Sequence, residues 1–226
     1  MANSPNNLLA LLQHGDSFFP SGGVAFSLGL EALRDDGRVG DAAGVERMIA
    51  DQIGGRWGSC DRAFIAAAHG AVDLERMVAL DVRLDAMTLP RELREGSRRN
   101  GAALLRVHAE LGTPRAADYR ALVRHDAAPG NLPIVQGLVL AGIGLGLGEA
   151  LSVAAHSFTV GLLAAGLRLG MIGHVSAQAA LGRLHRTIDE ALAGPLPAPD
   201  DAFAFTPLAE IAVMRHETST GRLFAT

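Results

Sequence analysis

The most apolar stretch of the chain reads LPIVQGLVLAGIGLGLG from Leu132 to Gly148. Gln136 interrupts this stretch and Glu149 closes it, so it falls short of the roughly 18–20 uninterrupted apolar residues that a membrane span needs. Asn131 and Pro133 at its start are typical of a helix N-terminus. The stretch therefore predicts a buried core helix rather than a membrane-spanning one.

A second apolar helix is predicted after the first, because Phe158, Leu162 and Leu167 follow at helical spacing. These two helices are expected to form the centre of the molecule. Glycine occupies every second position from Gly142 to Gly148, which resembles a nucleotide-binding loop. The GxGxxG spacing is not met and no strand is predicted before it, so close helix packing is favoured over phosphate binding.

Helical periodicity continues on both sides of this pair, whereas alternating stretches rich in Val, Ile and Tyr are missing. Asp41 is predicted to cap a helix that ends at Gly54-Gly55. Asp73 precedes a second amphipathic pattern, and Ser176 is expected to cap a third. The fold class is therefore predicted to be all-α.

Residues 1–226 are predicted to form one helical domain, a bundle of about ten helices with an extended C-terminal arm. Residues 1–5 are expected to be a flexible N-terminus. Residues 195–205 are rich in proline and are expected to form a loop, which a short helix from about Pro207 follows. Residues 217–226 would then form a C-terminal tail.

The composition excludes several classes of function. The chain has a formal net charge of -4 and a pI near 6.0, so it has no basic field to attract nucleic acid or an anionic membrane. All 20 basic side chains are arginine, which rules out a phosphate-loop lysine or a Schiff-base lysine. With Cys60 as the single cysteine and no secretory signal at its start, the chain is expected to be cytoplasmic.

No local motif for catalysis or metal binding is found in the sequence. No two of the eight histidines stand at the i, i+4 separation that places two ligands on one helical face, and Cys60 has no nearby thiol. A GxSxG nucleophile motif is missing as well. The prediction is a protein that is not an enzyme, with no catalytic residue, no metal site and no cofactor of its own.

Both ends of the chain carry unusual stretches. Arg222, Leu223 and Phe224 stand almost at the last residue, where free termini usually turn to small polar residues. The tail either folds back onto its own domain or docks on a partner, and the sequence leaves both open. Between Asp16 and Glu31, a Pro-Ser-Gly-Gly turn feeds a helix; a tight corner is favoured there over an anion site.

Four blocks together resemble the UreF family of urease accessory proteins, in order and spacing along nearly the whole chain. They are Asp16 to Glu31, Pro90 to Gly101, Arg168 to Gln178, and Thr206 to Phe224. The resemblance implies an all-α, non-catalytic scaffold that forms a homodimer. It also implies assembly with the accessory protein UreD, also called UreH, and with the GTPase UreG, so that nickel is delivered to the urease apoprotein.

The family motifs imply which residues of this chain contact partners. The C-terminal motif, linked by the resemblance to docking UreD, falls on Arg215, His216, Glu217, Arg222, Leu223 and Phe224. The N-terminal motif falls on Ser27 and Glu31. A third set, expected near the surface that faces UreG, consists of Arg168, His174 and Gln178. Phe26, Arg168, His174 and Ala225 depart from the residues that are common in the family.

Three other roles stay open at this point. Arg168 could modulate GTP hydrolysis by UreG, although a simple contact is favoured. The chain could instead be an enzyme or a small-molecule-binding protein with a pocket between its two apolar helices. It could also carry nickel directly through histidines.

Overall fold

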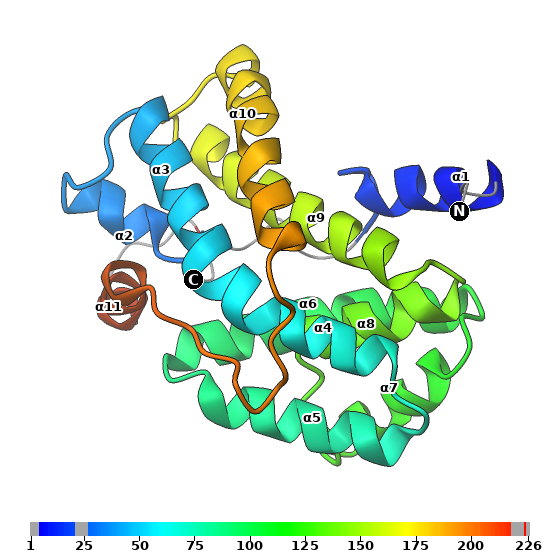
Figure 1. The fold of residues 1–226 in the computed structure, drawn as a ribbon. Coiled ribbons are helices and arrows are strands. Elements are labelled where there is room, and N and C mark those ends of the chain that lie inside the picture. The colour runs from blue at the N-terminus through cyan, green and yellow to red at the C-terminus, as the bar shows by residue number, and fades with distance from the viewer. Residues whose placement is uncertain (1–4, 21–26, 218–223, 225–226) are drawn as a thin grey trace.

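The protein is built from α-helices, and the residues that the structure describes contain no strand (Figure 1). The computed structural model describes residues 5–20, 27–217 and 224. The helical elements are α1 (Pro5–Gly15), α2 (Leu30–Asp35), α3 (Ala42–Gln52), the π-helix η2 (Ile53–Asp61), α4 (Arg62–His69), α5 (Leu74–Met87), α6 (Arg91–Glu110), α7 (Ala116–Arg124), α8 (Leu132–Gly142), α9 (Leu147–Arg168), α10 (His174–Ala193) and α11 (Pro207–His216). The prediction of an all-α single domain is confirmed.

Two predicted helix starts are confirmed by side-chain caps. Asp41 accepts a hydrogen bond from the Gly44 amide at 2.7 Å, and Asp73 accepts one from the Arg76 amide at 2.8 Å. Each cap joins residues three apart and therefore needs no tertiary contact. The predicted cap at Ser176 was wrong, because α10 begins two residues earlier, after Gly173.

The predicted helix end at Gly54-Gly55 was also wrong. The backbone runs through these glycines as η2 and continues as α4. Gly55 instead lets another segment cross closely, since a Cβ at this position would lie 2.7 Å from the Phe205 carbonyl oxygen. The Gly55 carbonyl accepts a hydrogen bond from the Phe205 amide at 2.7 Å, which ties the loop before α11 to η2.

The single helix predicted over 132–148 is two helices. Helix α8 ends at Gly142 and α9 begins at Leu147, with a turn between them in which Gly144 has a φ of 85°. Gly142 does pack closely, since a Cβ there would lie 2.7 Å from Thr113 Cγ2, but its neighbour is a loop. The helix-to-helix packing predicted for the alternating glycines was therefore wrong, and the stretch forms a corner. Gly137, near the middle of α8, makes the close helix approach instead, since a Cβ there would lie 2.5 Å from the Ile65 carbonyl of α4.

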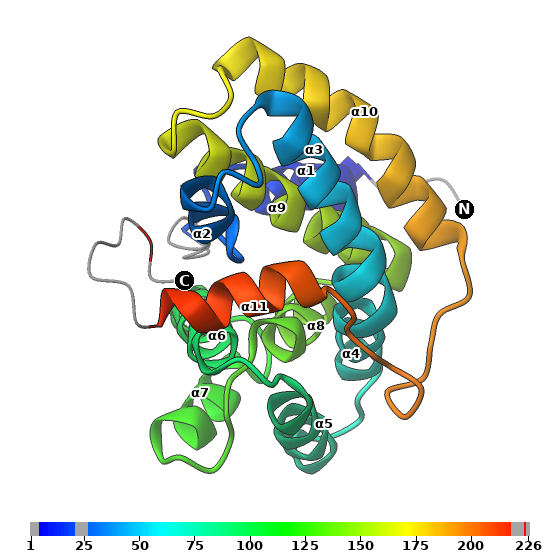
Figure 2. The ribbon, with the colours of Figure 1, turned by 90° about the vertical axis from the view of Figure 1, so that its left-hand side faces the viewer.

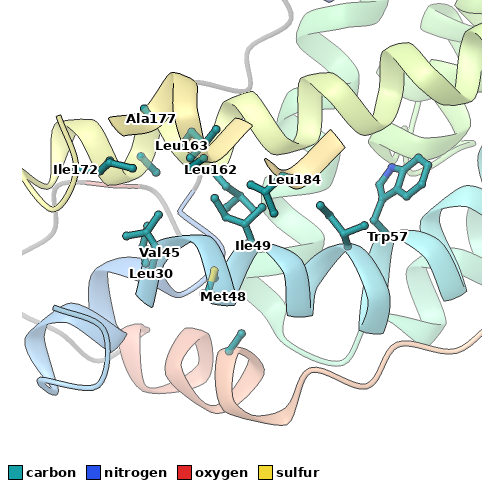
Figure 3. Close-up of a cluster of buried hydrophobic side chains, with 14 of the residues drawn as sticks. Leu30, Val45, Met48, Ile49, Trp57, Leu162, Leu163, Ile172, Ala177 and Leu184 are labelled. Atoms are coloured by element: carbon teal, nitrogen blue, oxygen red, sulfur yellow. The ribbon is translucent and has the colours of Figure 1, made fainter. Parts of the chain in front are cut away.

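Two hydrophobic cores lie on either side of α9. The first core joins α9 to α3 and α10, and Figure 3 shows Leu162, Ile49 and Leu184 meeting there. The second core surrounds α8 and includes Phe64 and Leu105. The prediction that the two apolar helices form the centre is confirmed, because α8 is buried along nearly its whole length and α9 contributes to both cores.

Helix α9 is long and apolar enough to span a membrane by length and composition. In this fold, however, 56% of its most apolar window is buried against other helices. Burial of this kind is what the core helix of a globular protein shows.

The C-terminal helix returns to the N-terminal half of the chain. Figure 2 shows α11 lying between α2 and α6, and it contacts both. Residues 195–205, the predicted proline-rich loop, contain no helix and lead from α10 to α11 along η2, where the Phe203 amide donates to the Ser59 carbonyl. The predicted N-terminal segment 1–5 lies mostly outside the described residues, and α1 begins at Pro5.

Candidate functional site

Three of the sequence blocks meet at one buried cluster under α11. His216, only 3% exposed, lies between two buried carboxylates. Its Nδ1 is 3.0 Å from Glu92 Oε2 of α6, and its Nε2 is 3.4 Å from Glu31 Oε2 of α2. Burying charged groups is costly unless they are paired, so this arrangement ties α11 to both neighbouring helices.

The Glu31 side chain also binds the end of the tail. The Phe224 amide donates to Glu31 Oε2 at 3.1 Å, and the Phe224 side chain is buried. The Arg168 guanidinium lies over the Phe224 ring, 4.2 Å from its centroid, which is a cation–π geometry. At Phe224 the chain has therefore folded back onto its own domain.

Ion pairs at the surface surround this buried cluster. Arg215 binds Asp36 through two nitrogens, at 2.7 and 3.1 Å. Arg91 Nε lies 3.5 Å from Glu217 Oε2. Exposed pairs of this kind contribute little to stability individually, so the buried contacts carry most of the attachment of α11.

The residues predicted to contact partners divide into two groups. Ser27, Glu31, His216 and Phe224 lie in the interior, where they support the surface, while Arg215, Arg168, His174 and Gln178 are exposed and Glu217 is half-buried. Arg222 and Leu223 lie outside the described residues, as do Gly22 and Gly23, where a tight corner was favoured over an anion site. The structure brings Arg168 together with the tail motif through Phe224.

An apolar stripe on the outer face of α11 was missed by the sequence analysis. Leu208, Ile211 and Met214 recur at three-residue spacing and are 50%, 55% and 44% exposed. Phe203 and Phe205 are exposed on the loop just before α11. Because the inner face of α11 is apolar as well, the helix is apolar nearly all round, which is typical of a helix covered on both sides.

A groove adjoins the first turn of this helix. It encloses about 550 Å³, and its wall includes Met48 and Arg47 of α3 together with Phe205 and Leu208. We call the stripe Leu208, Ile211 and Met214, with Phe203 and Phe205, the α11 surface. Contiguous exposed apolar residues beside a groove are characteristic of an interaction site.

The buried thiol of Cys60 is held in its neutral form. Burial, with a smaller contribution from Asp61, raises the pKa of the Cys60 thiol to about 12, so this thiol is not an activated nucleophile. Among the described residues, no group of three or more His, Cys, Asp or Glu side chains is close enough to hold a metal ion.

Acid is expected to destabilise the protein through His108. Burial, and then nearby His14, lowers the pKa of His108 to about 4, against about 6.5 in an unfolded chain. Between pH 6.5 and 4 the unfolded state binds a proton that the folded state does not. The contribution of His108 to the free energy of unfolding is therefore fully present above pH 6.5, and about 3 kcal/mol is lost as the pH falls to 4. Urea unfolding across pH 4–7 measures this slope.

Replacement of the imidazole tests that assignment. We expect the free energy of unfolding to depend less on pH in His108→Gln than in the wild type. His125→Gln, at an exposed position, should leave this pH dependence unchanged. His156, whose pKa is also lowered by burial, would retain part of the slope in both variants. Equal slopes in the wild type and in His108→Gln would contradict the prediction.

Comparison with known proteins agrees with this architecture. The UreF family model matches residues 39–185. A urease accessory protein UreF of Cereibacter sphaeroides strain KD131 is 36% identical over 220 residues, which cover 97% of this chain and 98% of the relative. Proteins of the same name from Arthrobacter sp. strain FB24 and Actinobacillus pleuropneumoniae are 33% and 30% identical, over 99% and 95% of this chain and 99% and 97% of their own lengths. The chain therefore belongs to the UreF family of urease accessory proteins.

Proposed function

We propose that this protein is a cytoplasmic, non-catalytic adaptor for urease maturation. It bridges UreD (UreH) and the GTPase UreG, as a homodimer, so that nickel is delivered to the urease apoprotein. Family membership supports a role in urease maturation. The observation that carries the adaptor role is the exposed α11 surface, on a helix held in place by the buried contact of His216 with Glu92. Nickel is cargo of the assembled complex in this proposal and is not bound by this chain alone.

The α11 surface has the features of a docking site for UreD. Its apolar side chains would bury the area that drives association, and Arg215 lies at its edge, where arginine is commonly enriched. The cluster of His216, Glu31 and Glu92 holds the helix in place before a partner arrives. A surface that is already ordered loses less conformational entropy on binding.

The surface assigned to UreG lies where α9 ends and α10 begins. Arg168, His174 and Gln178 are all exposed there. Because the Arg168 guanidinium stacks on Phe224, a contact role is favoured over a direct part in GTP hydrolysis. This contact also links the UreG surface to the tail, and through Glu31 to α11.

Replacement of the α11 stripe tests the adaptor role. In the triple variant Leu208→Ser, Ile211→Ser, Met214→Ser, we expect the affinity for UreD to fall about tenfold or more, because truncating central apolar anchors costs more than 1 kcal/mol each in many interfaces. Co-purification with tagged UreD, followed by titration, measures the change.

A matched triple variant controls for loss of exposed apolar surface in general. Val72→Ser, Val82→Ser, Leu89→Ser removes three exposed apolar side chains near α5, and its UreD binding should be unchanged. Both variants should keep the melting temperature of the wild type, since all six positions are exposed. Full UreD binding by the α11 variant would refute the docking role.

A further inference from the structure

A partly open cavity lies between α8 and α9. It has a volume of about 140 Å³, and most of its wall is apolar, including Leu140 of α8 with Val153 and Leu162 of α9. Helix α6, η2 and α1 also contribute to the wall, together with Phe19 and Leu28. Dry cavities of about this size in other proteins accommodate a benzene-sized molecule. The cavity is therefore large enough for one small ring.

One edge of this cavity carries two buried polar atoms without a hydrogen-bond partner, one on Trp57 and one on Asp61. Trp57 and Asp61 of η2 both line the cavity and are 2% and 7% exposed. Within the described residues, Trp57 Nε1 and Asp61 Oδ1 are buried and make no hydrogen bond. Buried polar atoms are costly to leave unpaired, so we expect a molecule that enters the cavity to supply the missing hydrogen bonds.

The backbone that presents this pair is itself unusual. Trp57 and Asp61 belong to a π-helix of nine residues, whereas π-helices are rare and occur mostly as single turns, often at functional sites. Figure 3 shows Trp57 projecting from this segment toward the core. A less favourable helix type thus coincides with the unpaired polar atoms and the cavity.

The charges around the cavity balance one another. Arg56 also lines the cavity, and its Nε lies 3.6 Å from Asp61 Oδ2. Burial keeps His108, another lining residue, neutral at pH 7 by lowering its pKa to about 4. The cavity therefore suits an uncharged molecule, since an ion would add an unpaired buried charge.

A hydroxyl group matches the polar edge. It accepts a hydrogen bond from an N–H donor, and toward a carboxyl oxygen it can donate or accept, whichever protonation state that carboxyl has. An amine with a positive charge, or a carboxylate, would not fit a site whose own charges are already paired.

We propose that this cavity binds a small uncharged molecule with an apolar body the size of a benzene ring and one hydroxyl group. The apolar body packs against α8 and α9, and the hydroxyl bonds to Trp57 Nε1 and Asp61 Oδ1. This site is separate from the α11 surface, and its occupation does not depend on the adaptor role. It lies where the sequence analysis placed a pocket for a small-molecule-binding protein, between the two apolar helices.

Phenol and toluene are the matched probes for this proposal, because they share one shape and differ in a single hydroxyl group. Trp57 is the only tryptophan in the chain, so fluorescence excited at long wavelength reports on this cavity alone. We expect saturable binding of phenol to the full-length protein, at least fivefold tighter than that of toluene. No saturable binding of phenol, or equal affinities for the two probes, would overturn the proposal.

Two variants separate the polar edge from the volume of the cavity, with ligand-observed NMR as the measurement. Trp57→Phe removes the N–H and keeps an aromatic ring, so it should weaken phenol at least fivefold and leave toluene unchanged. Ala154→Leu fills the cavity and should abolish binding of both probes, while Ala117→Leu, at an exposed position of α7, should have no effect. Unchanged phenol binding in Trp57→Phe, in a protein that keeps its helical circular dichroism, would place phenol elsewhere and refute the site.

Discussion

Replacement of Asp81 by alanine is expected to cost about 4 kcal/mol or more of the free energy of unfolding. Asp81 of α5 is fully buried and accepts hydrogen bonds from Tyr119 Oη and the Gly130 amide at 2.6 Å each, and from the amide and side chain of Asn131 at 3.0 and 2.8 Å. Each donor left without an acceptor in the interior costs about 1–3 kcal/mol. The loss is a large part of the 5–15 kcal/mol that is typical of a whole domain.

The expected loss is large because this carboxylate joins three parts of the chain. It links α5 to α7 through Tyr119 and to the start of α8 through Gly130 and Asn131. Asp85 Oδ1 also accepts a longer hydrogen bond from the Asn131 side chain, at 3.3 Å, whereas no other described side chain accepts from Tyr119 Oη or from the Gly130 and Asn131 amides. Its loss would loosen the second core from one side.

Equilibrium unfolding in urea measures the effect, with two companion variants. Asp81→Asn keeps the volume and one acceptor oxygen, so its loss should be intermediate. Asp189→Ala removes an exposed carboxylate from α10 and should change stability by no more than about 0.5 kcal/mol. A loss below about 1 kcal/mol in Asp81→Ala would show that the network does not hold these helices together.

The second large effect is expected at Gly137, where alanine should cost about 3 kcal/mol. A Cβ there would lie 2.5 Å from the Ile65 carbonyl oxygen, 2.7 Å from Ala68 Cβ and 2.8 Å from the His69 amide. All three atoms belong to the backbone or the first side-chain carbon of α4, so none can rotate away. Helices α4 and α8 would have to separate, and close-packed interiors resist such a shift.

A glycine without neighbours gives the matched control. Gly182 lies within α10, and a Cβ added there would meet nothing within 4 Å. Gly182→Ala should therefore stabilise the protein by about 0.5–1 kcal/mol, because alanine has less backbone freedom to lose on folding. If both alanine variants changed the urea midpoint in the same direction, close packing would not be the reason for the glycine at 137.

The elements that the sequence predicts well depend on neighbours along the chain. The caps at Asp41 and Asp73 are short-range interactions, and the periodic apolar positions that follow them specify a buried helix face wherever the helix packs. The family motifs likewise identify the chain, because a relative shares 36% identity over nearly its whole length. All-α class and family could therefore be predicted from residue order.

Apart from the cap at Ser176, the predictions that failed concern glycines, because a glycine allows several backbone conformations and does not specify one. Gly54-Gly55 was predicted to end a helix, yet the crossing of Phe205 makes Gly55 necessary inside one. The glycines of 142–148 were predicted to pack helices together, yet Gly144 turns the chain between α8 and α9. Only the neighbouring segments decide between these uses.

By itself the amino-acid sequence determined the helical class, two of the helix starts, the apolar helix pair at the centre and membership of the UreF family. The tertiary structure alone decided which motif residues are buried: His216 meets Glu31 and Glu92, Phe224 lies under Arg168, and the outer face of α11 is exposed. The physical reason is the distance along the chain over which each kind of interaction acts. Caps and periodicity act within a few residues, whereas burial depends on which distant segments pack together, and these contacts form only when the whole chain has folded.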